Sequence, residues 1–140
     1  MAIRKAEAVW EGSLKEGNGT MKFGTYEGGY TYESRFGEAS GTNPEELIGA
    51  AHAGCFSMAF SGDLGKAGFD PQRVSTQAQV FLEKVDGKNR ITRIHLESEA
   101  VVPEISPEKF QEIAQGAKQG CPVSAALAAI EITLNARLIQ

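Results

Sequence analysis

The fold of this chain is decided by the stretch GTNPEELIGAAHAGCFSMAFSGDLGKAG, residues 41–68. Asn43 or Thr42 can cap a helix here, Pro44 suits the first helical position, and the acidic residues that follow favour the positive end of the helix dipole. From there to about Lys66, small or apolar residues occupy nearly every side of the expected helix. A helix of that kind is typically buried. The sequence therefore predicts a long buried central helix.

Segments typical of strands lie on both sides of this helix. They cover residues 6–11, 20–26, 30–36, 74–85, 91–102 and 131–138. A hairpin turn is expected at 86–89, because Asp-Gly is a strong turn signal. The same combination of a cap and a proline predicts two more helices, from Ser106 to about Gly120 and from Pro122 to Ala129. This order of elements predicts an α+β fold with antiparallel sheets.

The composition is that of one ordinary globular domain, residues 1–140. Hydrophobic residues make up 41% of the chain, which is enough to bury a core. No apolar run approaches the roughly 20 residues of a membrane helix, and Glu7 interrupts what a signal peptide would need. We therefore expect a cytoplasmic protein with no membrane partner. The net charge of −4, without a basic stripe, also argues against a nucleic-acid partner.

Two cysteines, Cys55 and Cys121, stand 66 positions apart. In the reducing cytosol such a pair is more often redox-active, metal-binding or unpaired than a structural disulfide. Together with the two histidines it could bind zinc, but the spacings match no usual site, so no metal is expected. Two unrelated buried cysteines remain an open interpretation.

The reactivity of each cysteine depends on its setting. Cys55 lies inside the expected helix, where burial alone raises a thiol pKa, so a reactive thiolate there needs a cation such as Arg35 or His52. Cys121 precedes a proline at a helix N-terminus, where backbone N–H groups favour the thiolate. Plainer interpretations also fit, with Arg35 a solvated charge at a strand end and Glu45 an ordinary first-turn acid.

The stretch GTNPEELIGAAHAGCFSM, residues 41–58, closely resembles the signature of the OsmC/Ohr family, the osmotically inducible and organic hydroperoxide resistance proteins. The segment GCPVS at 120–124 fits the second part of that signature, and Arg35-Phe36 fits the region before it. The similarity runs from near Ala8 to the last strand. The Ala-Ala-His-Ala run before Cys55 looks more like the OsmC branch.

This resemblance implies one OsmC-like peroxidase domain in an intertwined homodimer, with active sites at the subunit interface. It implies that Cys55 is the peroxidatic cysteine and that Cys121 resolves it by forming a redox-active disulfide. Arg35 is implied as the activating arginine, with Glu45 as its acidic partner in a bidentate pair. An external thiol or dithiol would then reduce the disulfide, and no cofactor is implied.

The implied function is the reduction of organic hydroperoxides, and more weakly of H2O2, in oxidative or osmotic stress defence. Apolar residues near the signature, Phe36, Phe56 and Met58, would favour bulky organic substrates. One alternative is a non-catalytic stress or small-molecule-binding protein of the same fold. Another is a hydrolase that uses His52 with Cys55.

The spacing of the implied site raises a geometric question. Glu45 and Cys55 are ten positions apart in one expected helix, which separates them by roughly 15 Å along its axis. Either the helix begins later than expected, or Glu45 and Arg35 serve Cys55 of a partner chain. We favour the second explanation, because Asn43 and Pro44 are strong start signals.

Overall fold

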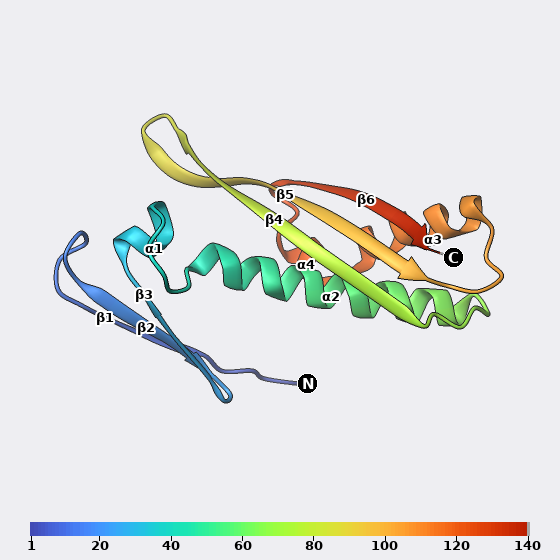
Figure 1. The fold of residues 1–140 in the computed structure, drawn as a ribbon, viewed down its shortest axis with the longest axis horizontal. Helices are drawn as coiled ribbons and strands as arrows, with labels where there is room; N and C mark the ends of the chain where they lie inside the picture. The colour runs from blue at the N-terminus through green and yellow to red at the C-terminus, as the bar shows by residue number, and fades with distance from the viewer. Residues whose placement is uncertain (140) are drawn as a thin grey trace. The chain divides into compact units, whose positions relative to one another are not determined.

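The computed structural model describes residues 1–139. The chain forms two compact units, Met1–Leu47 and the part from Ile48 onward (Figure 1). The first turn of one long helix, α2 (Pro44–Lys66), belongs to the first unit and the rest of that helix to the second. None of the helices in residues 1–139 is long and apolar enough to cross a membrane.

The first unit is an antiparallel meander followed by a short helix. Strands β1 (Glu7–Glu11), β2 (Asn18–Phe23) and β3 (Tyr26–Tyr30) pair in sequence order. The first strand is confirmed, but the predicted strand over 20–26 is wrong at its end, because the turn falls at residues 24–25. The predicted strand over 30–36 is wrong beyond Tyr30, because α1 (Tyr32–Phe36) occupies that segment. The reason is a capping box: Thr31 and Ser34 each accept the other's backbone N–H through their hydroxyl groups. Arg35 is therefore carried by a helix and not by a strand.

Helix α2 begins where the sequence predicts it. The Asn43 Oδ1 atom accepts the backbone N–H of Glu46 at 2.8 Å, which is the N-cap interaction expected before Pro44. The helix continues to Lys66, so its predicted extent is confirmed.

The second unit contains a mixed sheet. Strands β4 (Arg73–Val85) and β5 (Lys88–Val101) form a long hairpin. Its turn residues, Asp86 and Gly87, both have positive φ, at 52° and 76°, as a two-residue turn of this kind requires. Strand β6 (Glu131–Ile139) pairs with β5 in parallel, so the prediction of purely antiparallel sheets is wrong here. The reason is the crossover through α3 (Pro107–Gly120) and α4 (Pro122–Ala126), which returns the chain in the direction of β5.

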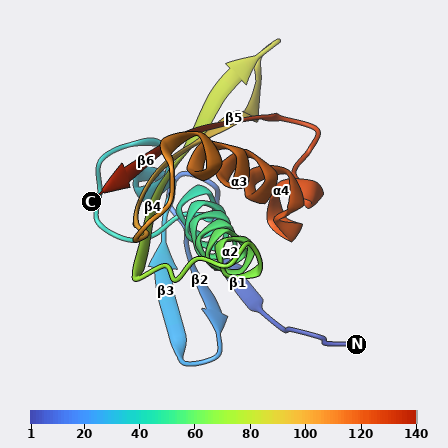
Figure 2. The same cartoon turned by 90° about the vertical axis from the view of Figure 1, so that its right-hand side faces the viewer.

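Helices α2 and α3 lie on the same face of this sheet (Figure 2). The Phe60 ring of α2 lies 5.2 Å from the Phe110 ring of α3, and both side chains are fully buried. On β5, Ile94 and Leu96 are also fully buried. These side chains form the centre of the core, which therefore lies between the helices and the sheet.

Only one face of α2 is buried in the single chain. His52, Phe56, Phe60 and Leu64 recur at a spacing of four residues and are fully buried. The opposite face is exposed, and Met58 on it is 81% exposed. The expectation of burial on all sides therefore does not hold for one chain.

Candidate active site

The two cysteines meet in the second unit. Cys55 projects from the middle of α2, while Cys121 lies between α3 and α4, as C-cap of the first and N-cap of the second. Both are free thiols, Cys55 half-buried and Cys121 fully buried. Each side chain shifts the pKa of the other, so the two thiols lie close together. Two residues 66 positions apart in the sequence are thus neighbours.

The contact between the thiols moves their pKa values in opposite directions. Burial raises the pKa of Cys55, and its hydrogen bond to Cys121 raises it further. Burial also disfavours the Cys121 thiolate, but hydrogen bonds from Cys55 and Ser124 outweigh that effect and hold the pKa of Cys121 below its ordinary value. Cys121 Sγ makes no regular capping hydrogen bond, but the backbone N–H groups of Val123 and Ser124 also help to lower its pKa. A reactive Cys55 thiolate therefore needs a cation from outside this pair.

A histidine and a serine lie beside the cysteines. The Nε2 atom of His52 is 2.7 Å from the hydroxyl of Ser124, and both residues are buried. Burial lowers the pKa of His52, which keeps the imidazole neutral near pH 7. The sequence interpretation placed His52 near Cys55 but missed Ser124. The available signal was spacing, since each lies three residues from a cysteine in a helical segment.

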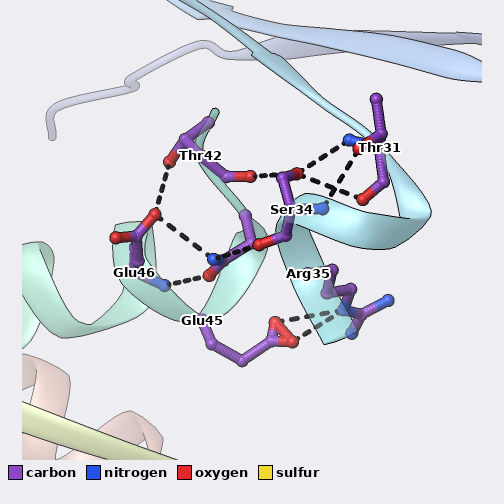
Figure 3. A network of polar contacts seen from close by, with 7 residues as sticks. Thr31, Ser34, Arg35, Thr42, Glu45 and Glu46 are labelled. Atoms are coloured by element: carbon purple, nitrogen blue, oxygen red, sulfur yellow. Dashed lines mark hydrogen bonds and ion pairs between the residues drawn. The ribbon is translucent and has the colours of Figure 1, made fainter. Parts of the chain in front are cut away.

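Arg35 and Glu45 form an ion pair in the first unit. Arg35 Nε lies 2.7 Å from one carboxylate oxygen of Glu45 and 3.3 Å from the other (Figure 3). The Glu45 side chain is only 9% exposed, whereas that of Arg35 is 36% exposed. We expected two guanidinium nitrogens to bind the two carboxylate oxygens. Instead, the Nε atom alone contacts both oxygens. The two terminal guanidinium nitrogens make no hydrogen bond to any other residue in the described part of the chain and remain available.

A network of hydrogen bonds fixes this ion pair (Figure 3). The Ser34 hydroxyl donates to the Thr42 carbonyl at 2.8 Å, and the Asn43 side-chain amide donates to the Ser34 carbonyl at 3.1 Å. These bonds join α1 to the start of α2. Arg35 and Glu45, ten residues apart in sequence, therefore lie on two helices that are tied to each other.

A small apolar cavity lies beside Arg35 within the first unit. Its volume is about 230 Å³. The cavity is lined by Trp10, Leu14, Tyr30, Thr31, Tyr32, Arg35 and Phe36. Phe36, one of the predicted substrate-binding residues, therefore lines a cavity next to a cation.

The other two predicted substrate-binding residues are placed differently. Phe56 is fully buried, with its ring 5.5 Å from that of Phe60, so it is part of the core. Met58 lies on the exposed face of α2. Residues 1–139 contain no cluster of three or more potential metal ligands.

The structure thus groups the four predicted catalytic residues as two pairs. Cys55 and Cys121 are in contact in the second unit, and Arg35 and Glu45 are in contact in the first. A thiol pair of this kind can be oxidised to a disulfide. A half-exposed arginine oriented by a buried carboxylate can stabilise a nearby anion.

Comparison with known proteins connects this geometry to a family. The chain is 51% identical over 141 aligned residues to proteins named Peroxiredoxin OsmC from Escherichia coli and Shigella flexneri, with 96% of each chain covered. Its fold matches an OsmC-like protein from Mycoplasma pneumoniae, with a TM-score of 0.78 and 16% identity over 99% of both chains. It also matches an organic hydroperoxide resistance protein from Elizabethkingia anophelis, with a TM-score of 0.74 and 24% identity over 99% of both chains.

These matches confirm the resemblance inferred from residues 41–58 and 120–124. The family model described as "OsmC-like protein" matches residues 37–135, which include α2 and both cysteines. The chain therefore belongs to the family of OsmC-like proteins.

Proposed function

We propose that this protein is a cysteine-based peroxidase that reduces organic hydroperoxides at the expense of an external thiol or dithiol. The observation that carries the proposal is the contact between the free thiols of Cys55 and Cys121. The names of the relatives support it, since two are called peroxiredoxins and one structural neighbour is a hydroperoxide resistance protein. We place its role in oxidative or osmotic stress defence, within the cytoplasm.

In the first step, the Cys55 thiolate attacks the terminal oxygen of the hydroperoxide. The O–O bond breaks, Cys55 becomes a sulfenic acid, and the departing alkoxide takes a proton and leaves as an alcohol. In the second step, the Cys121 sulfur attacks the sulfenic sulfur, forming a Cys55–Cys121 disulfide and releasing water. An external thiol or dithiol then reduces the disulfide by exchange.

Arg35 is proposed to supply the cation that Cys55 lacks. The guanidinium is charged at every working pH, so it can stabilise the thiolate and then the developing alkoxide. Glu45 accepts from Nε and leaves the terminal nitrogens free for this purpose. The pair is thus suited to hold Arg35 in one orientation.

We propose that the two units form one domain and that two chains form an intertwined homodimer. The exposed face of α2 supports this, because it contains Met58, which is 81% exposed, and Gly54, beside which a Cβ atom would meet nothing within 4 Å. A second copy of the chain can cover such a face. Since roughly 15 Å of helix separate Glu45 from Cys55, we propose that Arg35 and Glu45 serve the Cys55 thiol of the partner.

A mixing experiment tests this composite site. Chains carrying Arg35→Ala and chains carrying Cys55→Ser should each form homodimers with little or no activity, because each lacks a required group. The heterodimer should recover one working site of two, in which Cys55 of one chain meets Arg35 of the other. The measurement is hydroperoxide reduction after the two chains are refolded together. Inactivity of a verified heterodimer would show that the two residues act within one chain.

The cavity beside Arg35 predicts a preference for organic substrates. We expect Phe36→Ala to lower kcat/KM for cumene hydroperoxide by about tenfold, because an apolar contact worth about 1.4 kcal/mol is lost, and to leave kcat/KM for H2O2 nearly unchanged. The assay follows hydroperoxide consumption with a dithiol as reductant. An equal loss for both substrates would remove Phe36 from substrate binding. Failure of the unmodified protein to consume either substrate would favour a non-catalytic binding protein.

A further inference from the structure

His52 is a buried titratable residue that the proposed reaction leaves without a role. Its side chain is fully buried in α2, where a leucine would satisfy packing at lower cost. Its Nε2 atom bonds Ser124, but its Nδ1 atom has no partner among the described residues. Buried polar atoms without a partner are rare and usually have a reason. A residue kept under these conditions is a candidate for proton transfer.

Ser124 connects this histidine to the resolving cysteine. Cys121 is the N-cap of α4 and Ser124 is its third residue, and side chains at these two positions face each other. The Ser124 hydroxyl is one of the groups that lower the pKa of Cys121. The same hydroxyl lies 2.7 Å from His52 Nε2, so the structure places Ser124 beside the imidazole and one helical turn from Cys121. All three side chains are buried, which keeps bulk water away from them.

We propose that His52 is a positioning residue for disulfide closure, which acts through Ser124 to draw the proton from the Cys121 thiol. The inference rests on the proposed peroxidase function, and it concerns only the second step of that reaction. It assigns no part to His52 in the attack on the hydroperoxide.

The proton balance of this step is simple. When Cys121 attacks the sulfenic acid of Cys55, a sulfur–sulfur bond forms and the sulfur–oxygen bond breaks. The Cys121 proton passes to Ser124 while the Ser124 proton passes to Nε2, leaving an imidazolium. The hydroxide that leaves Cys55 takes up a proton, and the imidazolium gives one up. The sum is one thiol and one sulfenic acid converted to one disulfide and one water, with no further oxidant or reductant.

The neutral state of His52 agrees with this role. An imidazole can accept a proton only when it is unprotonated, and burial favours that form at neutral pH. The proposed role requires the tautomer with its proton on Nδ1, in which Nε2 accepts from the Ser124 hydroxyl.

The test separates the two steps in time. One equivalent of cumene hydroperoxide is mixed with protein, samples are quenched with a sulfenic-acid reagent and a thiol alkylator, and intact masses give the sulfenic acid and the disulfide at each time. In His52→Gln we expect sulfenic acid to form at a rate within about twofold of the unmodified protein, and disulfide closure to be slowed by about a hundredfold. Glutamine can still hydrogen-bond Ser124 but cannot accept a proton, so a purely structural role would be preserved.

Two further variants sharpen the result. Ser124→Ala removes the hydroxyl through which His52 is proposed to act, and it should slow closure by a similar factor. The double variant should be no slower than either single variant. Ser98→Ala, which removes a buried hydroxyl that bonds Thr76 at 3.0 Å, is the matched control and should leave both steps unchanged.

Normal closure in His52→Gln would overturn the proposal, as would equal slowing of both steps. If that variant does not fold, Ser124→Ala decides the question by the same criterion. Absence of any sulfenic acid or disulfide in the unmodified protein would instead contradict the peroxidase function itself, so the two failures are distinct.

Discussion

Cys55→Ser is expected to abolish hydroperoxide reduction, whereas Cys121→Ser should still consume one equivalent and stop with Cys55 as a stable sulfenic acid. The reason is the order of the two steps: the O–O bond is broken by Cys55, and Cys121 is required only afterwards. Removal of the attacking sulfur should lower the rate to that of the uncatalysed reaction. The measurement is mass spectrometry of each variant after one equivalent of oxidant.

The assignment of Cys55 as the attacking thiolate makes a strong demand on its surroundings. Within the cysteine pair alone, Cys121 and not Cys55 is the thiol that loses its proton more easily. In the second unit, burial and the thiol–thiol hydrogen bond raise the pKa of Cys55, while Cys121 is the better-stabilised anion. Our account therefore requires that Arg35 reverse this order. A sulfenic acid on Cys121 in the Cys55→Ser variant, with turnover intact, would mean that the roles are exchanged.

Arg35→Ala should lower kcat/KM by about a hundredfold or more, and Arg35→Lys by much less. Removal of a charged donor from a developing oxyanion costs about 10²–10³ in rate, and the lost cation also raises the pKa of Cys55, at about 1.4 kcal/mol per pKa unit. Lysine restores the charge but not the planar donor that Glu45 orients. The matched control is Arg137→Ala, which removes an arginine from an exposed pair with Glu99 and should have no effect.

A measurement of the Cys55 pKa tests the role of Arg35 independently of turnover. In a Cys121→Ser background, the rate of Cys55 alkylation can be followed against pH with and without Arg35. We expect the midpoint to move to higher pH in Arg35→Ala. An unchanged titration curve would remove Arg35 from activation of the thiol.

The elements with strong local signals were predictable from the sequence. Asn43 and Pro44 define the start of α2, and Ser106 caps α3 as expected, with its hydroxyl accepting the backbone N–H of Lys109 at 3.2 Å. The segment after Tyr30 was not, because its alternating aromatic residues resemble a strand. The capping box of Thr31 and Ser34 determines a helix there.

The features that depend on contacts between distant parts of the chain could not be predicted from the sequence. The parallel pairing of β6 with β5 follows from the crossover and leaves no local mark in the strand. The one-sided burial of α2 depends on which surfaces a single chain can supply. Likewise, the contact between His52 and Ser124 joins residues 72 positions apart, so their spacing from the cysteines could suggest each residue but not that the two meet.

For the candidate site, the sequence offered a set of residues but not their geometry. The sequence signature named Cys55, Cys121, Arg35 and Glu45, and the structure groups them as two pairs in contact. That Arg35 uses Nε alone toward Glu45 could not be inferred, because it depends on the angle between α1 and the first turn of α2.

The central claim is that Cys55 and Cys121 are a peroxide-oxidised pair, and one titration tests it most directly. The fully reduced protein is mixed with one equivalent of cumene hydroperoxide per chain, and the products are analysed by intact mass and peptide mapping. The account predicts that both thiols are lost, that each chain loses two hydrogen atoms in mass, that one equivalent of alcohol appears, and that the new disulfide joins Cys55 to Cys121 within one chain. Two thiols still free after the hydroperoxide has been offered, or a disulfide that links different chains, would contradict it.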